Sequence, residues 1–107
     1  YNNFISAHNQ MMISKTNKKE NYIPNFLAGW DNTPRYGVNG TVLNNYTPSR
    51  LASTVDDYFK NVSKIRRTKL VFFKAWNEWA EGNVLEPCER FDEKAYFELR
   101  EVLENLN

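Results

Sequence analysis

The clearest periodic pattern in the chain covers residues 47–62. Thr47 is a good helix N-cap, and Pro48 suits the first helical position. The apolar residues that follow recur at helical spacing and form one stripe, which consists of Leu51, Val55, Tyr58, Phe59 and Val62. The pattern therefore predicts an amphipathic helix that begins after Thr47 and buries this stripe.

Two short apolar runs predict strands. Leu70–Ala75 is apolar except for Lys74, and a run without polar alternation favours a strand buried on both faces, as in a parallel sheet. Tyr22–Trp30 predicts a second buried strand, with Pro24 tolerated only near its start. The strands are followed by two long loops, residues 31–46 and 76–91.

The two ends of the chain predict further helices. The apolar spacing of Tyr1–Ile13 fits the end of a helix, and polar residues 15–21 predict a loop. Asp92 is the expected cap of a last helix. The residues expected to face inward on that helix are Ala95, Tyr96, Leu99, Val102, Leu103 and Leu106.

This order of elements describes two successive β-loop-α units, so the expected fold class is α/β. Parallel strands joined by a right-handed crossover place both post-strand loops at the same edge of the sheet. In α/β barrels and open α/β sheets that edge carries the active site. The long loops at 31–46 and 76–91 are therefore expected to lie together and to hold the chemistry.

Composition excludes several classes of function. With 107 residues the chain has room for one small domain at most, and 41% hydrophobic and 25% charged residues are typical of a globular protein. A net charge of +1 gives no electrostatic reason to expect nucleic acid. The longest apolar run, Leu70–Phe73, is far shorter than the roughly 20 residues of a membrane span.

The numbers of Cys and His and the motifs of the chain limit the expected metal sites, cofactors and compartment. One cysteine, Cys88, and one histidine, His8, exclude an internal disulfide and metal sites built on several Cys or paired His. No nucleotide motif is present, so no cofactor is expected. The chain starts at Tyr1 without methionine, which predicts a piece of a longer protein. No signal-peptide pattern is seen, and a cytoplasmic location is expected.

The second long loop concentrates carboxylates and aromatic rings directly after the predicted strand. Glu78 and Glu81 are three residues apart, so one helical or 3-10 turn puts them on the same side. Two close carboxylates have their pKa values pushed apart, and glycoside cleavage needs such a pair, one acting as acid and one assisting at the sugar. Trp76 and Trp79 offer flat faces for sugar rings, and Asn77 suits sugar hydroxyls.

The same loop has a plainer interpretation. Two Glu beside two Trp also describe a helix N-terminus and core aromatics. In the first loop, Gly29–Arg35, Asp31 and Arg35 either pair and fix the loop or bind ligand, Asp31 a hydroxyl and Arg35 a carboxylate or phosphate. The composition Asp-Asn-Thr-Pro also fits a simple turn.

Taken together, the two loops resemble the signature segments of the glycoside hydrolase family 99-like domain of bacterial polysaccharide and O-antigen biosynthesis proteins, often labelled glycosyltransferases. The matching segments are Gly29-Trp30-Asp31-Asn32-Thr33-Pro34-Arg35 and Ala75-Trp76-Asn77-Glu78-Trp79-Ala80-Glu81-Gly82-Asn83-Val84-Leu85-Glu86-Pro87. The resemblance covers roughly residues 22–105, and residues 1–107 are then the C-terminal part of one (β/α)₈ TIM barrel.

The resemblance also implies roles for these residues. Its Glu-x-x-Glu pair falls on Glu78, the base that deprotonates a sugar 2-hydroxyl, and on Glu81, the general acid and then base at the leaving oxygen. Trp30 and Glu86 belong to the matching segments and are taken as substrate-binding with Trp76, Asn77, Trp79, Asp31 and Arg35. Lys74, and Cys88–Asp92 after Glu86-Pro87, depart from the family pattern.

Three hypotheses follow. The first is an enzyme acting on glycosidic bonds in cell-surface polysaccharide metabolism. The second is a glycan-binding module of the same fold without catalysis. The third is that these 107 residues are inactive alone, because a closed barrel needs about 250 residues and open strand edges favour association with the rest of the barrel or with another copy.

Overall fold

The computed structural model of the chain describes residues 4–18, 22–62 and 70–106. Within them lie the helices α1 (Phe4–Lys18), α2 (Thr33–Tyr36), α3 (Pro48–Asp57) and α4 (Lys94–Glu104). The strands are β1 (Asn25–Leu27), β2 (Phe72–Lys74), β3 (Asn77–Glu78) and β4 (Asn83–Val84). The first three residues, where the signal-peptide pattern was sought, lie outside the described part.

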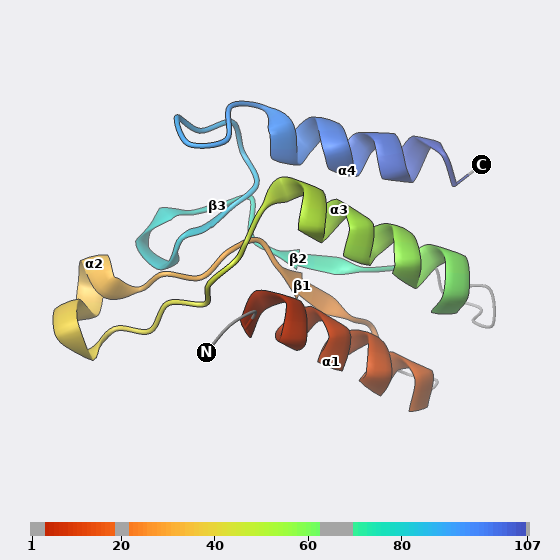
Figure 1. The fold of residues 1–107 in the computed structure, drawn as a ribbon, viewed down its shortest axis with the longest axis horizontal. Coiled ribbons are helices and arrows are strands. Elements are labelled where there is room, and N and C mark those ends of the chain that lie inside the picture. Colours follow the sequence, from red (N-terminus) through yellow and green to blue (C-terminus); the bar gives the residue numbers. More distant parts are fainter. Residues whose placement is uncertain (1–3, 19–21, 63–69, 107) are drawn as a thin grey trace.

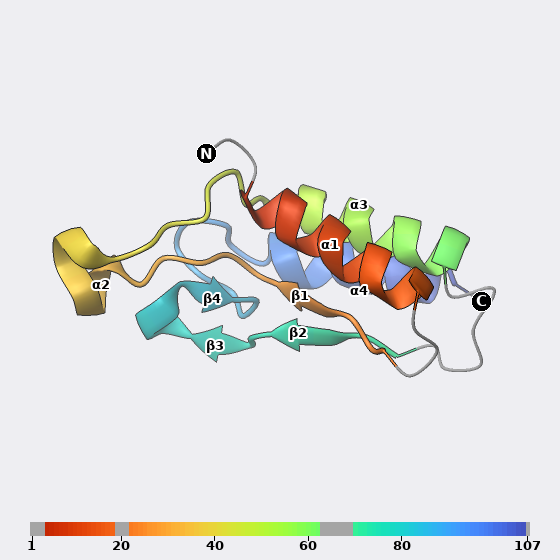
Figure 2. The same cartoon turned by 90° about the horizontal axis from the view of Figure 1, so that it is seen from below.

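The two longer strands form a parallel pair. β1 and β2 are aligned so that Phe26 lies opposite Phe73 and Leu27 opposite Lys74. The crossover between them contains α3, which packs against α1 on one side and α4 on the other. Figures 1 and 2 show these three helices side by side in one layer, with the strands in a second layer beneath them. The predicted order of β-loop-α units is present.

Helix α3 begins where the sequence predicted. The Thr47 hydroxyl accepts a hydrogen bond from the Arg50 backbone N–H at 3.2 Å, and Pro48 occupies the first turn. Leu51 and Val55 are buried, and so are Tyr58 and Phe59 of the π-helical turn that follows, Tyr58–Val62. A local cap and a regular apolar spacing were sufficient to define this helix.

The core gathers around β1. Phe26 is fully buried and meets the Tyr58 ring edge-on, with 5.9 Å between the ring centroids. Asn9 of α1 is also buried, and its side-chain oxygen accepts a hydrogen bond from the Leu27 backbone N–H at 3.1 Å. That contact satisfies a buried polar group and fixes α1 to the end of β1.

The prediction that β2 is buried on both faces was wrong for the described residues. Phe72 is 59% exposed and Leu70, just before the strand, is 55% exposed. The reason is the layer arrangement in Figure 2, where the long helices all lie on the same side of the strands. An apolar run indicates a buried strand only where other elements cover both faces.

The predictions for the terminal helices were also partly wrong. Helix α1 continues to Lys18, through residues that the sequence assigned to a loop. Lys15 of this segment is exposed, and an exposed position of a helix needs no apolar residue. Helix α4 begins after Glu93, which takes the N-cap position without a side-chain cap hydrogen bond, and Asp92, whose φ is 50°, lies one residue before it.

Only a narrow stripe of α4 is covered, because this helix packs against α3 along one side. Ala95 and Leu99 are buried, whereas three of the residues expected to face inward are exposed: Tyr96, Leu103 and Leu106.

Candidate functional site

The two loops that the sequence singled out meet at the carboxyl ends of β1 and β2. The Ala28 N–H donates to the Lys74 carbonyl at 2.9 Å and extends the pairing of the two strands. Beyond it, the Val84 N–H donates to the Ala28 carbonyl at 3.1 Å, and the Asp31 N–H donates to the Glu81 carbonyl at 2.8 Å. The hairpin β3–β4 therefore lies against the segment after β1, as expected for parallel strands.

Gly29 allows the closest backbone approach in this junction. Its φ is +84°, and a Cβ added there would lie 2.6 Å from the Gly82 carbonyl oxygen. A side chain at position 29 is thus disfavoured twice, by the backbone conformation and by the facing loop.

Replacing Gly29 with Ala is therefore expected to separate the two loops and to destabilise the protein. Gly37→Ala is the matched control, because Gly37 has a φ of +54° but no atom within 4 Å of an added Cβ. The control should lose about 1–2 kcal/mol from the positive φ alone. Gly29→Ala should lose about 1–3 kcal/mol more from overpacking. Denaturant unfolding measures both, and equal losses would show that the contact with Gly82 is unimportant.

The proposed carboxylate pair flanks the turn between β3 and β4. A 3-10 turn covers Trp79–Glu81, with Glu78 at its N-cap position, so the predicted turn is present. The Glu78 side chain is exposed, and in β3 it lies opposite Asn83. The Glu81 side chain is 25% exposed and forms an ion pair with Lys74. The two carboxylates thus differ in environment, one open to solvent and one held by an ammonium group.

Three other predicted residues of this hairpin are exposed to solvent. Trp76 and Trp79 are 51% and 56% exposed, and Asn77 is exposed in β3. The Trp79 indole N–H donates to the Glu86 carboxylate. Glu86 thereby orients the Trp79 ring, while Trp76 lies apart in a shallow groove of 370 Å³ against α4.

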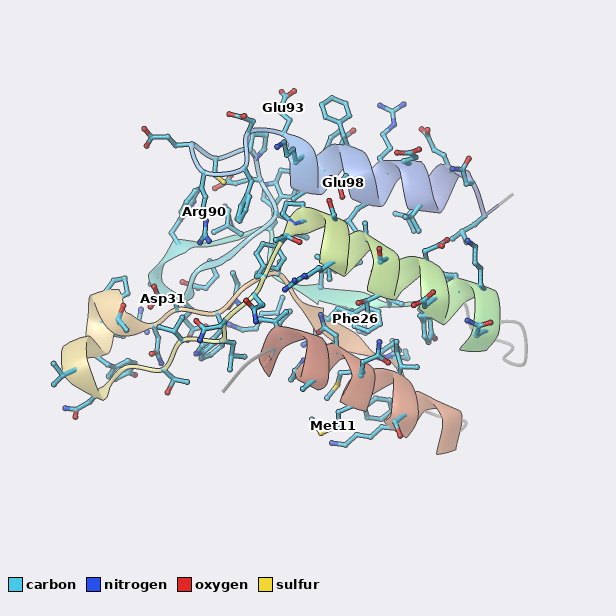
Figure 3. All side chains as sticks on the ribbon, in the orientation of Figure 1. Met11, Phe26, Asp31, Arg90, Glu93 and Glu98 are labelled. Carbon is cyan, nitrogen blue, oxygen red and sulfur yellow. The ribbon has the colours of Figure 1, made fainter. Side chains whose placement is uncertain are left out.

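A cleft of about 710 Å³ lies beside the junction. Three predicted residues line it, namely Trp30, Asp31 and Trp79, whereas Glu78, Glu81 and Arg35 are not among its lining residues. Four other cleft residues were not predicted as site residues from the sequence: Asn44, Tyr46, Arg90 and Phe91. In Figure 3, Asp31 extends from the segment after β1 and Arg90 from the loop before α4. The departure of Cys88–Asp92 from the family pattern was the signal that could have pointed to Arg90 and Phe91.

Tyr46 contributes an unusual hydroxyl to this cleft. Among the described residues, its buried oxygen has no hydrogen-bond partner. Burial is the main cause that raises the pKa of Tyr46 to about 12, with smaller contributions from Cys88 and Glu98. The ring itself is held edge-on against Phe91, with centroids 5.5 Å apart. Buried hydroxyls usually find a partner, so this oxygen is an exception among the described residues.

Asp31 and Arg35 do not form the pair that the sequence suggested. The Asp31 carboxylate accepts bonds from the Thr33 hydroxyl at 2.6 Å and the Thr33 N–H at 2.9 Å. These bonds, the hydroxyl first, hold the pKa of Asp31 below its usual value. Arg35 is exposed on α2. The turn interpretation therefore describes the Asp31 side chain better than an Asp31–Arg35 pair.

The described residues offer neither a cluster of metal ligands nor a helix that could span a membrane. No three His, Cys, Asp or Glu side chains there gather in a group suited to a metal ion. Within the same residues, each helix is too short or too polar to cross a bilayer.

Comparison with known proteins decides the family. A sequence model described as "Glycosyltransferase WbsX" matches residues 1–99, which include both loops of the site. The chain belongs to the glycosyltransferase WbsX family. The WbsX match and the relatives below support a family related to polysaccharide biosynthesis.

Relatives of this WbsX chain are found in two strains of Xanthomonas campestris pv. campestris, one of them strain B100. Both are called uncharacterized protein WxcX, and each is 44% identical over 71 residues. The match covers 63% of this chain and spans a tenth of the length of those relatives. No solved structure matches the chain.

Proposed function

We propose that the full-length protein acts on glycosidic bonds in cell-surface polysaccharide metabolism. In this proposal, residues 1–107 are the C-terminal β/α units of a (β/α)₈ barrel like that of glycoside hydrolase family 99. The observation that carries the proposal is the meeting of the two loops at the carboxyl ends of β1 and β2, with an ion-paired Glu81 in the junction. Barrel enzymes place their reacting groups at this end of the strands.

The chemistry follows the roles that the family 99 resemblance gives to the pair. Glu78 takes the proton of a sugar 2-hydroxyl, whose oxygen attacks the anomeric carbon. The glycosidic bond breaks, and Glu81 gives its proton to the leaving oxygen. Glu81 then takes a proton from water as that water opens the 1,2-anhydro ring, and Glu78 returns its proton to the 2-oxygen. An acceptor hydroxyl in place of water gives glycosyl transfer instead of hydrolysis.

The cleft beside the junction suits a sugar in both size and lining. Its volume of about 710 Å³ falls in the range of small-molecule sites, roughly 300–1,000 Å³. Trp30 and Trp79 offer apolar ring faces to the C–H face of a sugar. Tyr46, which packs edge-on against Phe91, adds a further aromatic residue to the lining. We propose that this cleft holds part of the glycan next to the carboxylates.

A binding module without catalysis is the second candidate function. It is favoured by one observation, that neither Glu78 nor Glu81 lines the cleft. In this alternative the aromatic cleft recognises the glycan, and the carboxylates contribute hydrogen bonds and the ion pair with Lys74.

Measuring binding and turnover on one substrate separates the two candidates. The full-length protein is incubated with an oligosaccharide that contains α-mannose, the substrate class that the family 99 resemblance implies, and that is labelled at its reducing end. Binding is followed by tryptophan fluorescence, and product by chromatography. An enzyme is expected to bind and to convert the oligosaccharide, with a bell-shaped pH profile. Binding without product at any pH between about 5 and 8 would support the binding module.

The exposed apolar side chains are proposed to contact the rest of the same protein. Phe72 and Leu70 lie at β2, and each is at least 55% exposed. Large apolar side chains exposed at a strand are typical of a face that another element covers. We propose that further barrel units cover it and that the 107 residues alone are inactive, because most of the barrel wall is absent. The cytoplasmic location also remains a proposal.

A further inference from the structure

Lys74 is the residue that the sequence marked as foreign to the family pattern, and the structure places it at the centre of the junction. It is the last residue of β2, opposite Leu27. Its ammonium group donates to the Glu81 carboxylate and, at 2.9 Å, to the Asn83 side-chain oxygen. The same nitrogen lies 5.0 Å from the centroid of the Trp30 ring. One cation therefore contacts both loops and the proposed acid.

Asn83 fixes the position of this cation independently of Glu81. It is fully buried, and its amide N–H donates to the Gly29 carbonyl. A primary amide that donates on one side presents its oxygen on the other, which here accepts from Lys74. The ammonium group is thus held by a buried, oriented acceptor and by the Trp30 face, and it is in place before any sugar binds.

We propose that Lys74 is a positioning residue that holds the ionised Glu81 carboxylate in the orientation from which it takes a proton from water, at the end of β2. The inference rests on the proposed function of Glu81. The physical argument is that a carboxylate on a turn has free side-chain torsions, and one charge-assisted bond to a fixed donor removes most of that freedom. Catalytic groups lose about a hundredfold in rate when misplaced by roughly 1 Å.

The test uses the full-length protein and the labelled oligosaccharide described above. Lys74→Met removes the charged ammonium group and keeps a similar unbranched stem, and kcat is expected to fall about tenfold to a hundredfold with KM nearly unchanged. Lys74→Arg keeps the charge and should restore part of kcat, though not all, because its planar fork differs from an ammonium group. Adding Lys74→Met to Glu81→Gln should cause little further loss, because the two residues act as one unit.

Lys60→Met is the matched control. Lys60 also pairs with a carboxylate, that of Asp56, which lies four residues earlier in the chain and 2.6 Å away. The Lys60 side chain is exposed, and the pair lies away from the junction. Lys60→Met should leave kcat unchanged. Lys74→Gln, which keeps a donor for Asn83, carries the test if the Met variant does not fold.

The inference is overturned if Lys74→Met changes only the melting temperature, or if its loss of kcat multiplies with that of Glu81→Gln. Failure of the proposed function gives a different result: Glu81→Gln itself then turns over the oligosaccharide at the wild-type rate, and the role of Lys74 falls with it.

Discussion

Replacing Glu81 with Gln in the full-length protein is expected to reduce turnover of an α-mannose-containing oligosaccharide by about a hundredfold or more. Gln keeps the size of the side chain and accepts one hydrogen bond from Lys74, but it carries no exchangeable carboxyl proton. The variant therefore separates proton transfer from the shape of the junction. Initial rates of product formation at saturating oligosaccharide measure the effect.

The control for this substitution is Glu104→Gln. Glu104 is exposed at the end of α4 and pairs with Arg100 at 2.7 Å, so the same chemical change is made away from the junction. This variant should keep wild-type turnover. Wild-type turnover by Glu81→Gln would remove Glu81 from the proposed chemistry. Binding of the oligosaccharide should persist in Glu81→Gln, because Glu81 does not line the aromatic cleft.

The largest expected loss of stability is for Phe26→Ala, about 3–5 kcal/mol. Phe26 is fully buried between the two layers, where it meets Tyr58 edge-on and Phe73 of β2 at 6.2 Å between centroids. Truncation removes these contacts and leaves a cavity where β1, β2 and α3 join. Denaturant unfolding of the full-length protein, followed by tryptophan fluorescence, measures the loss.

Phe97→Ala is the matched control for the stability measurement. Phe97 has the same side chain, but it is 51% exposed on α4. Its truncation is expected to change the free energy of unfolding by no more than about 0.5 kcal/mol. Equal losses for the two variants would mean that Phe26 is not in the core that supports the junction. A further cover over α4 in the whole protein would instead raise the cost of Phe97→Ala alone.

Several features were predictable because their causes are local in the sequence. The Thr47 cap and the apolar stripe with Leu51 and Val55 define α3, since both depend on residues within a few positions of one another. A helical or 3-10 turn at Glu78 and Glu81 was considered for the same reason, because the two residues are three apart, and a 3-10 turn covers Trp79–Glu81. The parallel order of β1 and β2 follows from alternation of strands and helices.

The failed predictions concern burial, which depends on neighbours distant in the sequence. Phe72 and Tyr96 are large hydrophobic residues of the kind found in protein cores, but among the described residues both side chains are exposed. Contacts between side chains have the same limit. Of the alternatives left open for Asp31, the turn describes its side chain, because Thr33 supplies two hydrogen bonds. Periodicity shows which side of an element is apolar, and it does not show what lies against that side.

By itself the sequence determined the elements, their order and the two chemical segments, because these follow from backbone propensity, capping and short-range spacing. The tertiary structure alone decided the role of Lys74. In the sequence, this residue interrupts an apolar strand. In the fold, it meets Glu81 and an Asn83 amide whose other end is bonded to Gly29, 54 residues away. An ammonium group that is partly withdrawn from water needs oriented acceptors, and here Glu81 and Asn83 of one hairpin supply them while Trp30 of the other loop offers its ring face.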